Sequence, residues 1–299
     1  MEYERFMKIA IEEAEISLRE GNNGFGAVIV KDGVLIAASH DRDSSEGDPT
    51  SHAELNVIRE ASKKLGRKLR GCILISTHEP CPMCASAAVW SEITAIVYGC
   101  SIKETLMQGR KRINIPCTNV FHKSAAKISV IDGILKAECS VLYREDVRNE
   151  IIRLRNADDN VLRELNQDSV SRRTAWFQKN RASFGFISPD LLESGYRLLL
   201  ERFRIMPDEA PIVHKSKDRV IFHSRNFCPT LEACRILGLD TRQVCRLINE
   251  NSTDILLKQI DSRLCFSRNY EKLRPYEAYC EEMISISDKS DMIRPHSLR

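Results

Sequence analysis

The spacing of apolar residues predicts a helix and then two strands at the start of the chain. Apolar residues from Phe6 to Leu18 recur at helical intervals, which predicts an amphipathic helix over residues 2–20. The stretch FGAVIVKDGVLIAASH that follows predicts two strands joined by a tight turn at Asp32-Gly33. A polar loop, DRDSSEGDPTS, separates this hairpin from the next helical pattern.

Helices and strands continue to alternate as far as about Arg155. The predicted elements are a helix from His52, a strand GCILIST, a helix from Cys81 to about Trp90, a strand TAIVYGC, a short helix over 102–107, a strand AKISVID and one long helix from Leu135 to about Arg155. This alternation favours a layered α/β domain whose sheet is covered by helices on both faces. The opening hairpin makes that sheet mixed, because its two strands run antiparallel.

The pattern changes in the second half of the chain. The stretch NADDNVLRELNQDSVS is polar and rich in acids, so we expect a first domain over residues 1–157 and a linker over 158–171. A helix in LLESGYRLLLERFRI, a hairpin in APIVHKSKDRVIFHS and two helices around Gly238 predict a smaller α+β domain over 172–285. The last residues, 286–299, are expected to be a flexible tail. Two short helices also occur in DNA-binding helix-turn-helix units, but they are more common as plain packing.

Composition and charge are those of an ordinary globular protein. The 299 residues are 42% hydrophobic and 29% charged, with a net charge of +3, which is too small to indicate a dedicated nucleic-acid-binding protein. Apolar runs are too short to span a membrane. The stretch MEYERFMKIAIEEAE has acidic residues where a secretory signal has an apolar core, so we expect a cytoplasmic protein whose cysteines, 11 in number, are mostly reduced.

A group of metal-binding residue types stands at two predicted helix starts. Cys81 and Cys84 lie three residues apart in PCPMC, so both sulfurs face one side of the helix, whose N-terminus favours thiolates. His52 opens the preceding helix in the triplet His-Ala-Glu. Catalytic zinc usually takes three protein ligands and leaves a fourth position for water. We therefore predict one Zn²⁺ per subunit, bound by His52, Cys81 and Cys84.

Glu54 completes a catalytic group. It is placed to accept a proton from a zinc-activated water and to pass it to the ring nitrogen and the departing amine of a substrate. A redox pair of the thioredoxin type would not need the histidine or the glutamate. The combined H-x-E … P-C-x-x-C arrangement is the known signature of zinc-dependent deaminases.

Other cysteines are weaker candidates for a metal site. Cys72 and Cys100 lie in apolar strands and are expected to be buried core thiols. In the second half, five cysteines could form another metal site, but their spacing matches no zinc finger and buried free thiols are the default expectation. These residues are Cys228, Cys234, Cys245, Cys265 and Cys280.

Residues 1 to about 155 resemble the cytidine and deoxycytidylate deaminase-like superfamily. The stretches FGAVIVKDG, DPTSHAELNVIREASKKLG and EPCPMCASAAVW are similar to bacterial guanine deaminases, and VIDGILKAECSVLYRED is similar to the closing helix of tRNA adenosine deaminases. The resemblance implies a three-layer α/β/α domain with a five-stranded mixed sheet, one zinc per subunit and a homodimer. It also implies that Phe25 forms an apolar wall of the substrate pocket, that Trp90 stacks on the ring, and that the main chain near Ala53 and Cys81 contacts the substrate.

One position departs from the family pattern. The family usually has an asparagine eleven residues before the zinc histidine, where this chain has Asp41. An ionised aspartate only accepts hydrogen bonds, so Asp41 would favour a substrate ring that presents N–H groups. An alternative is that Asp41 only caps a turn. Trp90 has an alternative as well, as a core aromatic residue.

A basic loop follows the fourth predicted strand. Arg110, Lys111 and Arg112 fall where family members shape the mouth of the pocket. They could contact a phosphate or an RNA backbone, although a solvated surface is the simpler expectation.

These observations predict an enzyme, a zinc-dependent hydrolytic deaminase that converts the exocyclic amino group of a nucleobase-like heterocycle or nucleoside to a carbonyl and releases ammonia. The expected partner is a small heterocyclic amine, with nucleic acid possible but not favoured. Two alternatives stay open: a tRNA adenosine deaminase, and a zinc-stabilised binding or regulatory protein without catalysis. The sequence does not assign a reaction to residues 172–299.

Overall fold

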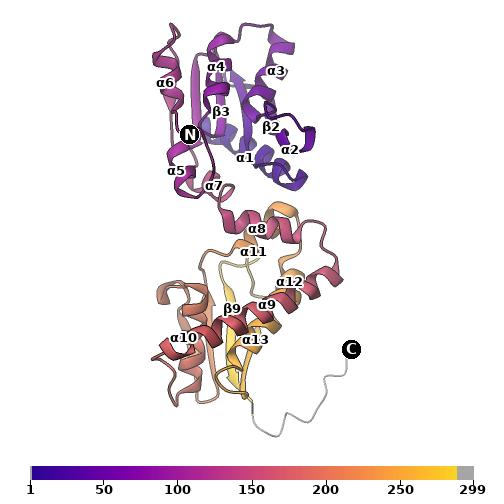
Figure 1. Ribbon diagram of the computed structural model, residues 1–299, viewed down its shortest axis with the longest axis vertical. Helices are drawn as coiled ribbons and strands as arrows, with labels where there is room; N and C mark the ends of the chain where they lie inside the picture. Colours follow the sequence, from indigo (N-terminus) through magenta and orange to yellow (C-terminus); the bar gives the residue numbers. More distant parts are fainter. Residues whose placement is uncertain (1, 288–299) are drawn as a thin grey trace. The chain divides into compact units, whose positions relative to one another are not determined.

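A computed structural model describes residues 2–287 of the chain (Figure 1). The chain divides into two compact units, residues 1–155 (unit 1) and residues 156–299 (unit 2). The division after Arg155 lies close to the end expected for the first domain. None of the helices in residues 2–287 is long and apolar enough to cross a membrane.

Unit 1 is an α/β domain built around a mixed sheet. Its elements are α1 (Glu2–Glu20), β1 (Gly26–Lys31), β2 (Val34–His40), α2 (Asp43–Glu46), α3 (Ala53–Leu65), β3 (Cys72–His78), α4 (Pro82–Trp90), β4 (Ala95–Cys100), α5 (Ile102–Met107), α6 (Cys117–His122), β5 (Ser129–Ile131), α7 (Lys136–Val141) and α8 (Glu145–Leu154). In this part of the described chain the sheet has five strands in the order β2-β1-β3-β4-β5. β1 pairs antiparallel with β2 and β3, while β3, β4 and β5 are parallel.

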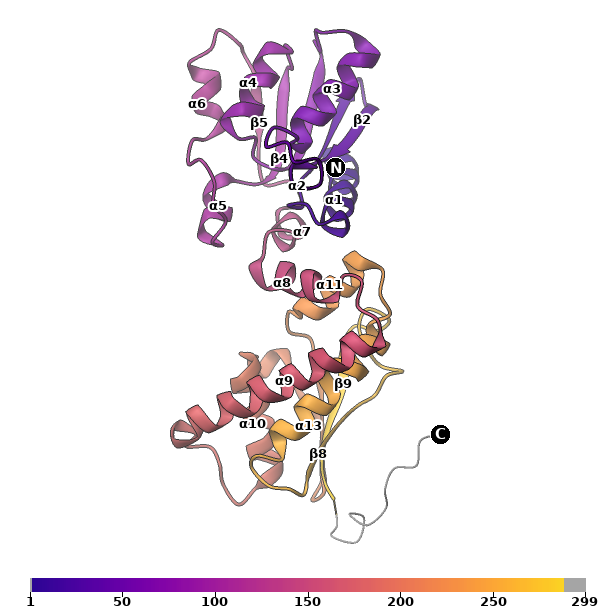
Figure 2. The same cartoon turned by 45° about the vertical axis from the view of Figure 1, so that its right-hand side comes forward.

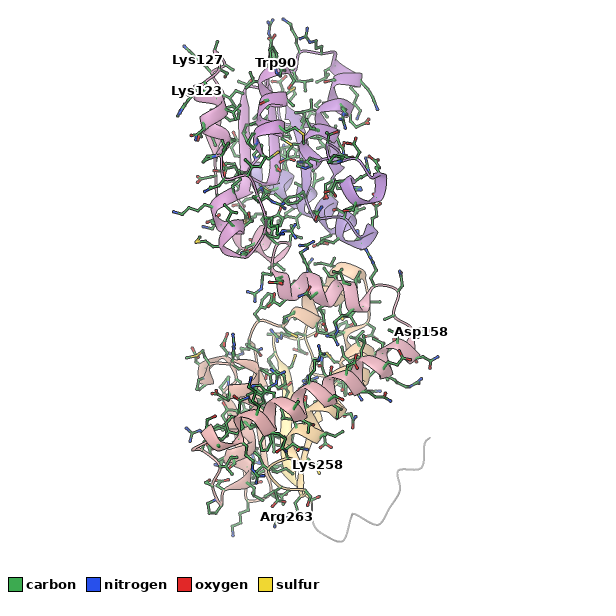
Figure 3. The ribbon with its side chains drawn as sticks, in the orientation of Figure 1. Trp90, Lys123, Lys127, Asp158, Lys258 and Arg263 are labelled. Atoms are coloured by element: carbon green, nitrogen blue, oxygen red, sulfur yellow. The ribbon has the colours of Figure 1, made fainter. Side chains whose placement is uncertain are left out.

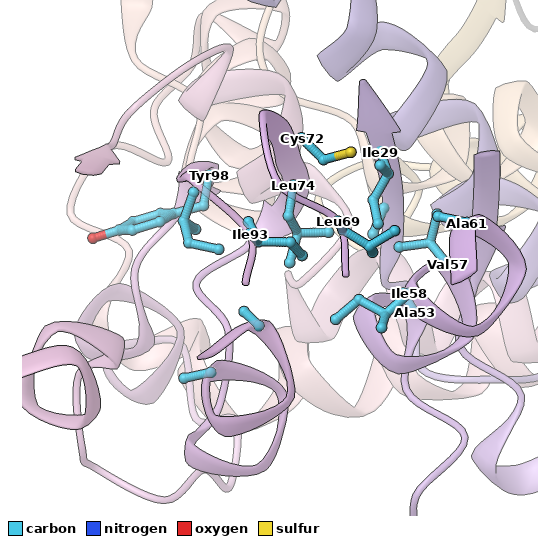
Figure 4. Packing of buried hydrophobic residues seen from close by; sticks show 14 of the residues in the cluster. Ile29, Ala53, Val57, Ile58, Ala61, Leu69, Cys72, Leu74, Ile93 and Tyr98 are labelled. Carbon is cyan, nitrogen blue, oxygen red and sulfur yellow. The ribbon is translucent and has the colours of Figure 1, made fainter. Parts of the chain in front are cut away.

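Helices cover both faces of this sheet (Figure 2). Ile29 and Leu74 belong to the cluster formed with Val57 and other residues of α3 and α4 (Figure 4). The opposite face of β1 lies against α1, where a side chain at Gly26 would meet the main chain of Ala10. Because neighbouring strand residues point to opposite faces, the alternation along β1 explains how one strand contacts both layers. The three-layer α/β/α arrangement expected from the sequence is confirmed.

The opening hairpin has the turn that its sequence predicts. Asp32 and Gly33 both have positive φ, 50° and 73°, as a two-residue turn between twisted antiparallel strands requires. The prediction of one long helix from Leu135 to Arg155 is wrong. α7 ends at Val141 and α8 begins at Glu145, and Leu142 and Tyr143 between them are fully buried.

Unit 2 is a smaller domain with its own sheet. Its elements are α9 (Asp159–Asn180), η1 (Arg181–Ser183), α10 (Leu191–Phe203), η2 (Pro207–Glu209), β6 (Ile212–Lys215), β7 (Arg219–Ser224), α11 (Pro229–Leu237), α12 (Thr241–Cys245), η3 (Arg246–Glu250), α13 (Asn251–Leu257), β8 (Leu264–Arg268) and β9 (Cys280–Ile286). Within the described residues the sheet has four strands in the order β6-β7-β9-β8. Phe177, Leu198, Phe222 and Phe266 contribute to its buried core.

Residues 158–171 are not a linker: Asp158 caps α9, and its carboxylate accepts from the backbone of Asn160 and Val161. Leu162 and Phe177 bury one side of this helix, which explains why the polar stretch is ordered. The flexible tail expected over 286–299 falls almost wholly outside the described residues.

Candidate metal centre

The three predicted ligands stand at the beginnings of two helices. His52 caps α3 in an extended conformation, with φ −76° and ψ 151°. Cys81 caps α4 in a similar conformation, and Pro82 occupies the first helical position, where its missing N–H carries no penalty. Cys84 follows one turn later and is fully buried. The prediction that each half of the motif starts a helix is confirmed.

The three ligand atoms form a nearly equilateral triangle. Nδ1 of His52 lies 3.6 Å from Sγ of Cys81 and 3.6 Å from Sγ of Cys84, and the two sulfurs are 3.6 Å apart. Zinc at about 2.3 Å from sulfur and about 2.0 Å from nitrogen in a tetrahedron separates such ligands by about 3.5 to 3.8 Å. The donor set and its spacing therefore fit one zinc ion with a fourth position left for another ligand.

The pKa values of His52 and Cys81 favour an imidazolium beside a thiolate. The hydrogen bond with Cys84, supported by that with His52, outweighs burial and lowers the pKa of Cys81 to about 4. The hydrogen bond with Cys81 is the main cause that raises the pKa of His52 to about 9. A thiolate is the form of cysteine that binds a metal, so Cys81 is prepared for ligation by its surroundings.

Glu54 lies beside the triangle. Its Oε2 is 3.5 Å from Sγ of Cys84, and its Oε1 is 3.5 Å from Oγ of Ser76 on β3. The side chain is 4% exposed, and burial, followed by the charge of Cys81, raises the pKa of Glu54 to about 7. A carboxyl group with such a pKa can exchange protons near neutral pH.

Aromatic rings pack behind Phe25. Phe25 stacks on Tyr143 with ring centres 5.1 Å apart and meets the edge of His78 at 5.3 Å. Tyr143 donates its hydroxyl to Thr77 at 2.7 Å, and His78 contacts Thr105 and the main chain of Glu79. Burial is the main cause that lowers the pKa of His78 to about 4, so its ring is neutral. The half-buried Phe25 is therefore held rigidly by its neighbours.

Asp41 is engaged inside the chain. Oδ1 accepts from the hydroxyl of Ser17 at 2.5 Å and from the backbone of Phe25 at 2.8 Å. Oδ2 accepts from the backbone of Asn23 at 2.9 Å, and the residue is 1% exposed. These contacts favour the alternative in which Asp41 holds a turn, and they give no support to a direct contact with substrate.

Glu79 connects two loops to the PCPMC motif. Its Oε2 accepts from the backbone of Ile102 at 2.9 Å, and its Oε1 accepts from the backbone of Cys117 at 2.9 Å. The carboxylate therefore satisfies backbone N–H groups at the beginnings of α5 and α6. It thereby holds both ends of the segment from Ile102 to Cys117, which comprises α5 and the basic loop.

The basic loop is not a solvated surface. Arg110 is 8% exposed and donates through Nη2 to the carbonyl oxygen of Asn23 at 3.0 Å. Arg112 is half-buried, and its guanidinium carbon lies 4.5 Å from the centre of the Phe25 ring. Only Lys111 of the three is exposed. The loop thus folds back over the residue expected to form the pocket wall.

Trp90 and Ala53 differ in their surroundings. Trp90 stands at the end of α4 away from Cys81 and is 74% exposed, so the alternative of a core aromatic is wrong (Figure 3). It borders a surface pocket with Val89, Ile115 and other residues, and no contact among residues 2–287 places it against the triangle. Ala53 is fully buried at the start of α3. The contact of its main chain with substrate stays a prediction.

The cysteines outside the motif do not form another site. Among residues 2–287, His52, Cys81 and Cys84 are the one group of three metal-binding side chains whose ligand atoms lie within 4.8 Å of one another. Cys72 and Cys100 are buried core thiols, as expected. Sequence reasoning missed three neighbours of the site. His78 stands three residues before Cys81, and Tyr143 and Arg148 come from much later in the chain; His78 and Tyr143 pack on Phe25, and Arg148 lies beside Asn23.

Comparison with known proteins agrees with this geometry. A family model described as the cytidine and deoxycytidylate deaminase zinc-binding region matches residues 1–100. The chain is 45% identical to the guanine deaminase of Bacillus subtilis over 100 residues, which are 33% of this chain and 64% of that protein. It is 37% identical to the tRNA-specific adenosine deaminase of the same organism over 147 residues, 48% of this chain and 89% of that protein.

A solved structure from work on A-to-I editing by tRNA:A34 deaminases is similar as well. It is 32% identical, with a TM-score of 0.41, and the match covers 46% of this chain and 98% of that one. This chain spans less than two thirds of the length of the Bacillus guanine deaminase, and nearly all of the Bacillus tRNA-specific adenosine deaminase. By the matching family region and these relatives, the chain belongs, through its first half, to the cytidine and deoxycytidylate deaminase-like superfamily.

Proposed function

We propose that this protein is a zinc-dependent hydrolytic deaminase acting on a nucleobase-like heterocycle or its nucleoside. The observation that carries the proposal is the triangle of His52, Cys81 and Cys84 at 3.6 Å spacing, with the buried carboxyl of Glu54 beside it. In this proposal one Zn²⁺ is held per subunit, and the substrate is a small heterocyclic amine.

The residues divide the work of an aminohydrolase. A bound zinc ion would make a water molecule acidic enough to attack a ring carbon at neutral pH. Glu54 takes one proton from the water and delivers it to the ring nitrogen. It then takes the second proton from the hydroxyl group added to the ring carbon and delivers it to the amine, so that the C–N bond breaks and ammonia leaves while a carbonyl forms. Phe25 supplies an apolar wall for the ring, and the main chain near Ala53 and Cys81 donates hydrogen bonds to the substrate. Asp41 positions Phe25 through the backbone bond at 2.8 Å.

Ammonia release from a panel of purines, pyrimidines, pterins and triazines, and from the matching nucleosides, tests the proposal. We expect turnover of at least one compound by zinc-loaded protein. The matched variant is Glu54→Gln, which keeps the shape of the side chain but cannot act as a base. It should retain zinc, measured by elemental analysis, and lose turnover by at least about a hundredfold. Retention of full turnover by Glu54→Gln would sink the assignment of Glu54.

A tRNA adenosine deaminase is the second candidate. It is favoured by the match to 89% of the tRNA-specific adenosine deaminase, against 64% of the guanine deaminase. Deamination of an anticodon stem-loop, with no ammonia released from free bases or nucleosides, would select this candidate. A purely regulatory role is disfavoured by Glu54, because a site that only binds zinc does not need a buried carboxyl beside it.

We also propose that the protein forms a homodimer through the surface around Trp90. An indole that is 74% exposed lies beside Val89, Ile115 and Val120 at a pocket between α4 and α6. Exposed apolar groups of this kind are typical of protein–protein contacts.

A further inference from the structure

Three arginines gather around two residues next to the metal centre. Arg110 donates to the carbonyl oxygen of Asn23 at 3.0 Å, and the Arg112 guanidinium lies over the Phe25 ring at 4.5 Å. Arg148 comes from α8, and its Nη2 lies 3.5 Å from Oδ1 of Asn23. Two elements far apart in sequence thus bring three positive charges to the same place.

These charges lack carboxylate partners in the described part of the chain. Within residues 2–287 no ion pair joins Arg110, Arg112 or Arg148 to an acid. Nη1 of Arg112 donates to the main chain of Lys111 at 2.9 Å, whereas its Nη2 is buried with no hydrogen-bond partner. A buried N–H without a partner, on a charged group, is costly unless a ligand satisfies it.

Two carboxylates beside Asn23 are already occupied. Asp41 accepts from Ser17, Asn23 and Phe25, as described above. Asp43 accepts from the side-chain amide of Asn23 with both oxygens, at 2.8 and 2.7 Å. Acidic groups therefore act on Arg112 and Arg148 only through space, and none of them accepts a hydrogen bond from Nη2 of Arg112.

Arg112 also lies within electrostatic reach of the metal centre. Burial lowers the pKa of Arg112, and the charges of Tyr143, Glu54, Asp41 and Cys81 oppose that effect. The guanidinium is therefore part of the same electrostatic environment as the catalytic carboxyl. A ligand bound by Arg112 would therefore lie near the proposed substrate site.

We infer that Arg112, with Arg110 and Arg148 beside it, binds a phosphate group attached to the substrate, so that the enzyme acts on a nucleotide and not on a free base. The inference rests on the proposed function and specifies its substrate class. A guanidinium presents several N–H donors in a fixed fork that matches the oxygens of a phosphate. A neutral carbonyl would satisfy Nη2 with an ordinary hydrogen bond, whereas a phosphate oxygen would make a stronger, charge-assisted one. The phosphate is either the 5′-phosphate of a mononucleotide or a phosphodiester of an RNA strand.

The test compares substrates that differ only in phosphate. Zinc-loaded full-length protein is assayed for ammonia release from purine and pyrimidine bases, nucleosides and nucleoside 5′-monophosphates, and from an RNA stem-loop with an adenosine in its loop. We expect kcat/KM for a phosphate-bearing substrate to exceed that for its nucleoside at least about tenfold. In Arg112→Gln this ratio should fall about tenfold. Arg67→Gln, which removes an exposed arginine elsewhere in unit 1, should leave the ratio unchanged.

A binding measurement separates the possible failures. Calorimetric titration with a nucleoside 5′-monophosphate and with inorganic phosphate should show weaker binding to Arg112→Gln than to the unmodified protein. For RNA, the variant should bind more weakly and show a salt dependence reduced by about one phosphate contact. Preference for the mononucleotide identifies a phosphomonoester, and preference for the stem-loop identifies a phosphodiester.

Two results would overturn the inference. If nucleosides and nucleotides are deaminated equally well, and Arg112→Gln affects both alike, the proposed deaminase stands and the phosphate site does not. If phosphate binds in an Arg112-dependent way but the zinc-loaded protein deaminates none of the compounds, the proposed function fails, and with it the claim that the phosphate belongs to a substrate.

Discussion

The backbone N–H of Phe25 donates to Oδ1 of Asp41 at 2.8 Å, and the hydroxyl of Ser17 donates to the same oxygen at 2.5 Å. One buried carboxylate therefore connects the end of α1, the start of β1 and the end of β2. In the proposed function Phe25 forms the apolar wall for the substrate ring, and this connection would then set the position of that wall.

Replacement of Asp41 by asparagine should destabilise the protein. Asparagine has one acceptor oxygen, so the amide cannot accept all three hydrogen bonds that Asp41 accepts from Ser17, Asn23 and Phe25. We expect a loss of about 1–3 kcal/mol in the free energy of unfolding, measured by urea denaturation. If Asp41 instead meets the substrate, the variant will unfold like the parent protein and change only the choice of substrate.

Removal of the metal should lower stability through the triangle of ligands. Because zinc binds the folded site and not an organised site in the unfolded chain, its binding free energy adds to the stability of the fold. A chelator should lower the melting temperature of the zinc-loaded protein by several degrees. Cys84→Ser should melt near the temperature of the chelated protein and should not respond to the chelator. An unmodified protein that shows no response, although its zinc has been removed, would contradict this prediction.

A side chain at Gly26 should disrupt the contact between α1 and the sheet. A Cβ at this position would lie 1.9 Å from the carbonyl oxygen of Ala10 and 2.6 Å from the backbone nitrogen of Ala14. We expect Gly26→Ala to cost about 1–3 kcal/mol or more of unfolding free energy, measured by chemical denaturation. Gly185→Ala is the matched control, because no atom lies within 4 Å of a Cβ built there. Equal effects of the two substitutions would show that the contact at α1 is looser than described.

The contribution of His40 to stability should depend on pH. Burial lowers the pKa of His40, but the hydrogen bond with Glu13 and the charges of Glu20 and Glu13 outweigh it and raise that pKa above 6.5. A raised pKa means that the stabilisation is fully present below the unfolded value and is lost as the pH rises through the folded value. We therefore expect His40→Gln to lower the melting temperature more at about pH 6 than at about pH 8.5. A pH-independent difference would show that the ring contributes by packing alone.

Disruption of the proposed dimer surface should change the molecular mass in solution. Trp90→Glu places a charge where an exposed apolar group lies beside Val89 and Ile115. We expect light scattering after size-exclusion chromatography to show a dimer for the parent protein and a monomer for the variant. Trp90→Phe, which keeps an apolar ring, should remain dimeric. A monomeric parent protein would rule out the dimer.

Local sequence patterns predicted the hairpin and the closeness of Cys81 and Cys84 because the causes of both are local. Asp32-Gly33 is a turn that needs positive φ, and the spacing of Cys81 and Cys84 matches one helical turn. Tyr143 shows the opposite situation. The apolar run around it continues the pattern of a helix, but its ring is committed to Phe25 and its hydroxyl to Thr77, so the helix breaks there.

The basic loop shows why the rest of the site was not predictable. Its charges alone are typical of a solvated surface. What buries Arg110 is a hydrogen bond to Asn23, 87 residues earlier in the chain. No pattern within the loop encodes that contact. The helix α9 was not predicted for a similar reason. Its sequence is mostly polar, and the few apolar residues that anchor it, such as Phe177, are recognised only by their burial in the fold.

The two hydrogen bonds accepted by Glu79 keep the residues of the triangle apart from the segment that could determine which substrate is accepted. The carboxylate clamps Ile102 and Cys117 and stands two positions before Cys81. One carboxylate therefore anchors both ends of the segment that carries Arg110 and Arg112. Under the proposed function, substitutions within residues 102–117 would change substrate choice while His52, Cys81 and Cys84 stay the same, both in evolution and in protein engineering.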